Sequence, residues 1–96
     1  MPAGYVIAHI DVTDPEAYRD YVAAVTPIVA KFGGEYVVRG GAAEFHEGEP
    51  PGERVVVLRF PSVAAAKDWY HSEEYAPVRA MRQAASTSVQ TIVEGA

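Results

Sequence analysis

Apolar and polar residues alternate in four short segments of the chain, as is typical of β-strands. The four segments are residues 5–12, 35–41, 53–60 and 87–94. In the first of them the alternation separates two faces. The face predicted to lie against helices carries Val6, Ala8, Ile10 and Val12, and the opposite face carries Tyr5, Ile7, His9 and Asp11.

Two longer segments between these strands have the spacing of amphipathic helices. In the first helix one apolar stripe contains Tyr18, Val22, Val25, Val29 and Phe32. Asp14 is a suitable N-cap with Pro15 at the first helical position, and Gly33 or Gly34 ends the helix in the left-handed conformation. Ser62 and Ser72 each precede a helical piece, so the second segment is predicted to be two short helices with a joint near residues 71–72.

The resulting order is βαββαβ, and residues 1–96 are predicted to form a single domain. Right-handed crossovers place both helical segments on one face of the sheet. The predicted fold is α+β and ferredoxin-like, with a four-stranded antiparallel sheet. The third strand is apolar on both faces, as expected of a central strand that is covered on both sides. We therefore expect a homodimer that forms through the open face of the sheet.

Composition narrows the range of partners. The net charge is −5, which argues against nucleic acid because phosphate binding needs a basic face. The chain has no cysteine, in keeping with a reducing compartment, and it shows neither a secretory signal nor a membrane span. These features predict a cytoplasmic protein.

Four stretches of the sequence resemble a known family. They are GYVIAHIDVTDPEAYRDYV (4–22), VVRGG (37–41), ERVVVLRFPS (53–62) and DWYHSEEYAPVRAMR (68–82), and they are similar to the domain of unknown function 1330 family. The resemblance implies a member of the dimeric α/β-barrel superfamily, in which two ferredoxin-like subunits join through their sheets, with a cavity on the sheet side. That superfamily includes cofactor-free monooxygenases, muconolactone-type isomerases, haem enzymes and ligand-sensing domains, so the fold implies no single activity.

His9 is the candidate catalytic residue, because an imidazole in a partly closed cavity can act as a general base near neutral pH. The alternative is a histidine that is hydrogen-bonded across the dimer interface. Arg39 is expected on the same face if the strands register that way. There it would hold an anionic group of a substrate, or it would form an internal ion pair with Asp11 or Glu44.

The stretch from Trp69 to Arg82 concentrates aromatic and charged residues. One aromatic side chain of the pair at positions 69 and 70 is expected to fill the core. Further candidate contacts of a cavity ligand are Tyr70, Ser72 and Tyr75. Arg79 and Arg82 lie three residues apart and are expected to pair with Glu73, Glu74 or the partner chain.

The three histidines have no spacing that suggests a metal site, and no cofactor is expected. The connection at residues 42–52 is longer than a usual hairpin loop, and its relation to a site is open. Two classes of function follow. The first is a small cofactor-free enzyme that acts on an organic acid or enolisable compound bound in a small-molecule cavity. The second is a non-catalytic ligand-binding or structural homodimer.

Overall fold

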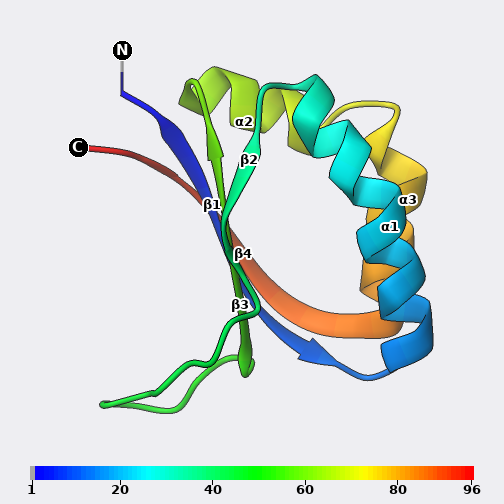
Figure 1. The fold of residues 1–96 in the computed structure, drawn as a ribbon, viewed down its shortest axis with the longest axis vertical. Helices are drawn as coiled ribbons and strands as arrows, with labels where there is room; N and C mark the ends of the chain where they lie inside the picture. The colour runs from blue at the N-terminus through cyan, green and yellow to red at the C-terminus, as the bar shows by residue number, and fades with distance from the viewer. Residues whose placement is uncertain (1) are drawn as a thin grey trace.

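The computed structural model describes residues 2–96, and its elements follow the predicted order (Figure 1). The strands are β1 (Gly4–Val12), β2 (Glu35–Arg39), β3 (Arg54–Phe60) and β4 (Ser86–Glu94). The helices are α1 (Pro15–Lys31), α2 (Val63–Tyr70) and α3 (Tyr75–Ala85). The fold is α+β and ferredoxin-like, as the sequence predicts.

The four strands form one antiparallel sheet in the order β2-β3-β1-β4. The position of β3 inside the sheet confirms the interpretation of its apolar sequence as a central strand. Figure 1 shows the helices together on one side of this sheet, while the connection between β2 and β3 extends away from them. The opposite side, here called the open face, is not covered by any element of residues 2–96.

The core lies between the sheet and the helices. Val6, Ala8 and Ile10 of β1 are buried there, which confirms the predicted face of this strand. Trp69 of α2 is also buried, and its ring stacks on Tyr75 of α3 with 4.3 Å between the ring centroids. Of the aromatic pair that ends α2, Trp69 is therefore the one that fills the core.

Local signals set the helix ends as predicted. The Asp14 carboxylate accepts a hydrogen bond from the Ala17 backbone N–H at 3.1 Å, and Gly33 ends α1 with a φ of 81°. Ser62 caps α2 by accepting from the backbone N–H of Ala65 at 3.1 Å. No helix within residues 2–96 is long and apolar enough to cross a membrane.

Candidate functional site

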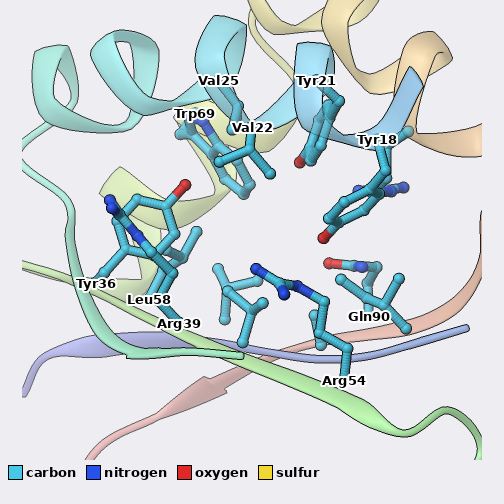
Figure 2. A pocket seen from close by; sticks show the side chains of 15 residues that line it. Tyr18, Tyr21, Val22, Val25, Tyr36, Arg39, Arg54, Leu58, Trp69 and Gln90 are labelled. Carbon is cyan, nitrogen blue, oxygen red and sulfur yellow. The ribbon is translucent and has the colours of Figure 1, made fainter. Parts of the chain in front are cut away.

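A cavity lies between α1 and the sheet, on the face that the helices cover. Figure 2 shows Tyr18 and Tyr21 of α1 on one side of it and Arg54 of β3 on the other. The α1–sheet cavity is lined by Val6, Ala8, Ile10, Tyr18, Tyr21, Val22, Val25, Tyr36, Arg39, Arg54, Val56, Leu58, Trp69, Arg82 and Gln90. It therefore has an apolar wall and a small number of polar groups, which is typical of small-molecule sites.

Every charged side chain that lines the cavity is an arginine. Arg39 lies at the exposed end, Arg54 is half-buried, and Arg82 is only 3% exposed. Within residues 2–96 no aspartate or glutamate lines this cavity, and none forms an ion pair with any of the three arginines. The cavity therefore has a positive charge that the described part of the chain does not compensate.

Arg54 extends into the cavity from the first position of β3 (Figure 2). Its guanidinium carbon lies 5.3 Å from the centre of the Tyr18 ring. Gly40 lies close to it, because a Cβ at that position would clash with the guanidinium of Arg54 as it stands. Gly40 also has a φ of 65°, a conformation that favours glycine.

Arg82 is held by a chain of phenols. Its Nη1 donates a hydrogen bond of 2.9 Å to the Tyr75 hydroxyl, which lies 2.9 Å from the hydroxyl of Tyr21. This chain joins α3 to α1 at the inner end of the cavity.

Two of the guanidinium groups have a donor without a partner. Nε of Arg54 and Nε of Arg82 are both buried, and neither has a hydrogen-bond partner among residues 2–96. Buried polar atoms are nearly always paired, because a buried donor without a partner lowers stability by about 1–3 kcal/mol. The loss is larger when the donor is charged. Nε1 of Trp69 is likewise buried without a partner, so three of the four such atoms within residues 2–96 belong to residues of this cavity wall, and the fourth is Nδ1 of His9.

Burial changes the acidity of the phenols. It raises the pKa of Tyr21 and of Tyr75 above the ordinary value of 10.0, and it does the same for Tyr18, where the charge of Arg54 partly offsets it. These three side chains are therefore neutral at physiological pH and can donate hydrogen bonds.

The expectation that Arg39 shares the face of His9 is wrong. A β-bulge between Tyr36 and Val38 shifts the register, so that Arg39 pairs with Val56 on the face toward the helices. His9 is on the open face, where its neighbours across the sheet are Val55 and Val89. The α1–sheet cavity is on the helix side of the sheet, and His9, the candidate base, does not line it.

The other candidate residues have separate positions. Tyr70 lines a second hollow, formed with Arg82, Gln83, Ser86, Ser88 and Gln90. Ser72 is at the joint between α2 and α3, where its hydroxyl donates to the Trp69 carbonyl at 2.9 Å and accepts from the Tyr75 N–H at 3.1 Å. Tyr75 does not line the α1–sheet cavity itself, but its hydroxyl is hydrogen-bonded to the lining residues Tyr21 and Arg82.

The ion pairs expected between Arg79 or Arg82 and Glu73 or Glu74 do not form within residues 2–96, and pairing with a partner chain stays a prediction. Glu74 pairs with Lys31 of α1, and Arg79 donates to the carbonyl of Tyr70. Gly41 has open space where a Cβ would lie, so no close contact there requires a glycine. Residues 40–53 lie outside the regular elements and contribute no side chain to the α1–sheet cavity.

The sequence interpretation missed four polar or aromatic residues of the cavity: Tyr21, Tyr36, Arg54 and Gln90. Arg54 had a usable signal, because strand alternation places it on the same face as Val56 and Leu58. A charged residue in that apolar stripe indicates a polar contact inside the fold.

The fold and cavity define a ferredoxin-like α+β domain with a cationic, tyrosine-lined site between sheet and helices. Across residues 2–96, histidine, cysteine and carboxylate side chains form no group of three that could hold a metal ion. The chain belongs to the family described as domain of unknown function (DUF1330), whose model matches residues 3–96. No curated protein matches it.

Several solved structures have a similar fold. A protein of unknown function from Rhodopseudomonas palustris, RPA0582, superposes with a TM-score of 0.81 at 20% identity, over 99% of this chain and 83% of that one. SnoaB, a cofactor-independent oxygenase from Streptomyces nogalater, superposes with a TM-score of 0.66 at 14% identity, over 97% of this chain and 92% of that one. For a conserved protein from Methanosarcina mazei Go1 the TM-score is 0.62 at 15% identity, over 100% of this chain and 95% of that one. At these identities the likeness establishes the fold alone.

The buried phenols predict a loss of stability at alkaline pH. Their folded-state pKa values lie above 10.0, so the unfolded chain releases these protons first. Their contribution is fully present below pH 10, and the free energy of unfolding then falls by about 1.4 kcal/mol per pH unit for each phenol. Urea unfolding between pH 8 and 11 should show this slope, and Tyr21→Phe should make it shallower. Tyr5→Phe, on the open face, is the matched control. An equal slope in Tyr21→Phe and the unsubstituted protein would contradict the assignment.

Proposed function

We propose that this protein binds a small organic anion in the α1–sheet cavity. The observation that carries the proposal is the pair of guanidinium groups, Arg54 and Arg82, whose buried Nε donors lack partners among residues 2–96. A buried charge without a counter-charge is strongly destabilising. An anionic ligand would supply both the missing charge and the missing acceptors.

The lining supports an organic ligand over an inorganic ion. Val22, Val25 and Leu58 give the cavity an apolar wall (Figure 2). The guanidinium of Arg39 lies over the Tyr36 ring, and that of Arg54 lies near the Tyr18 ring. A planar or aromatic acid would place its ring against this wall and its anionic group against the guanidinium of Arg54, which can hold a carboxylate by two parallel hydrogen bonds.

The size of the cavity sets a requirement for binding. Its volume is about 30 Å³, enough for about one or two water molecules. The side chain of Arg54 extends into this space (Figure 2). Entry of an organic anion therefore requires Arg54 to rotate toward the mouth at Arg39, where it would meet the incoming charge.

Binding is better supported than proton-transfer catalysis by His9. The imidazole is on the open face, so a ligand held by Arg39 and Arg54 is on the other side of the sheet. The neutral phenols of Tyr18 and Tyr21 are donors and poor bases. SnoaB shares the fold as a cofactor-independent oxygenase, which makes a reaction on the bound anion the second candidate, with the cavity donors in place of His9.

Replacement of Arg54 by methionine should weaken anion binding without loss of stability. Hydrogen bonds to a charged group contribute about 1.5–3 kcal/mol, so the affinity for 4-nitrobenzoate should fall at least about tenfold by isothermal titration calorimetry. Because the charge of Arg54 is unpaired in the free protein, Arg54→Met should melt at the same temperature or higher.

Arg59→Met is the matched control, since Arg59 is exposed on the open face beside Glu35. It should leave the affinity for 4-nitrobenzoate unchanged. Equal affinity in Arg54→Met and the unsubstituted protein would exclude the proposed site. So would the absence of binding in the unsubstituted protein.

We also propose that two copies associate through the open face of the sheet. Ile7, Val55 and Val57 are only partly covered there, and Val89 is 50% exposed. Nδ1 of His9 is buried on the same face and has no partner within residues 2–96. A second copy would bury these side chains and offer acceptors to His9. The resemblance to dimeric α/β-barrel proteins supports the same arrangement.

A charge at the centre of the open face should separate the copies. Val89→Glu is expected to convert a dimer into a folded monomer in sedimentation velocity, because burial of an unpaired carboxylate is costly. Met81→Glu, at an exposed apolar position on α3, should remain dimeric. A monomeric unsubstituted protein, or a dimeric Val89→Glu, would refute the association through this face.

A further inference from the structure

The hydrogen-bond chain Arg82–Tyr75–Tyr21 has a direction that follows from its protons. Arginine can only donate, so the Tyr75 oxygen accepts from Arg82. The two phenols then share one hydrogen bond, and one phenolic proton remains for another acceptor. The direction of the chain decides which tyrosine carries that remaining proton.

Burial favours Tyr21 as the residue with the remaining proton. Tyr75 is 0% exposed, and no further acceptor for its hydroxyl exists among residues 2–96. If Tyr21 donated to Tyr75, a buried O–H would be left unpaired at a cost of about 1–3 kcal/mol. Tyr21 instead lines the cavity, and Figure 2 shows its hydroxyl turned toward the open space.

The cation at the far end strengthens this arrangement. A hydrogen bond received from a charged donor polarises the acceptor and makes its own proton a better donor, and the effect passes along a chain. Arg82 therefore acts on Tyr75, and Tyr75 acts on Tyr21. The outcome is a neutral phenol that presents a polarised O–H to the cavity.

We infer that Tyr21 donates this hydrogen bond to an oxyanion of the ligand, and that the ligand is a planar phenol or enol bound in its ionised form. The inference rests on the proposed anion site and specifies its ligand class. Preorganised donors of this kind stabilise a localised negative charge on oxygen. Tyr21 touches the ligand, while Tyr75 and Arg82 are positioning residues.

The charge distribution distinguishes this class from simple carboxylic acids. A carboxylate spreads its charge over two oxygens and suits the fork of Arg54 near the mouth. A phenolate or enolate concentrates its charge on one oxygen, which suits the single O–H of Tyr21 at the inner end. The rings of Trp69 and Tyr18 lie beside that position and offer apolar contact to a flat molecule.

The test uses two probes with the same ring, 4-nitrophenol and 4-nitrobenzoate. The anion of 4-nitrophenol absorbs visible light, so its pKa can be followed by absorbance with and without saturating protein. We expect the pKa of the bound probe to fall by about one unit, which corresponds to about tenfold tighter binding of the anion than of the neutral form.

Tyr21→Phe should weaken binding of the 4-nitrophenol anion about tenfold, while binding of 4-nitrobenzoate changes less than about threefold. Tyr75→Phe keeps the Tyr21 hydroxyl but separates it from Arg82, and should give an intermediate loss. Tyr5→Phe, which removes a phenol on the open face, should leave the affinities for both probes unchanged.

The outcomes separate this inference from the proposed function. If 4-nitrobenzoate binds but the pKa of bound 4-nitrophenol is unshifted, the oxyanion inference is wrong and the anion site remains. This measurement uses the unsubstituted protein alone, so the inference can be refuted even if Tyr21→Phe does not fold. A full pKa shift in Tyr21→Phe would overturn the role of Tyr21. If neither probe binds, both proposals fail.

Discussion

The candidate site of this protein depends on a buried guanidinium that has no carboxylate partner among residues 2–96. Arg82 is almost fully enclosed, and its hydrogen bond to Tyr75 continues to Tyr21, so that one chain of polar contacts joins α3 to α1. An apolar contact at that position would be simpler and as stable. The polar chain has a different consequence, because it brings a positive charge and an unpaired donor to the wall of a cavity. A ligand there can supply the counter-charge and the hydrogen-bond acceptor.

The β-bulge in β2 determines which chemistry reaches that cavity. With regular pairing, Arg39 would oppose Val55 and stand on the open face with His9. The extra residue between Tyr36 and Val38 turns it toward the helices, where it joins Arg54. Bulges commonly redirect side chains in this way. The sheet consequently divides its functions: arginines and tyrosines gather on the helix side, while His9 is left among valines on the face that we assign to association.

Most of the fold follows from the alternation of apolar residues and from helix caps, both of which can be recognised in the sequence. The site depends on the strand register and on packing between distant segments, which the sequence does not reveal. Apolar alternation and the caps at Asp14 and Ser62 were sufficient to place the elements and the central strand. The bulge in β2 has no clear mark in the sequence, so Arg39 was assigned to the wrong face. Arg82 was expected to pair with Glu73, Glu74 or the partner chain, whereas it is buried against Tyr75. Its burial results from the packing of α3 on α1, which involves distant parts of the chain.

The unpaired guanidinium groups of the cavity are proposed to receive an organic anion. Heteronuclear NMR can test this by following the Nε–H resonances of the arginine side chains during titration with 4-nitrobenzoate. We expect saturable shifts for Arg54 and Arg82, because these donors gain a charge or an acceptor, and no shift for Arg59 on the open face. Shifts confined to exposed arginines such as Arg59, or no saturable shift at all, would contradict it.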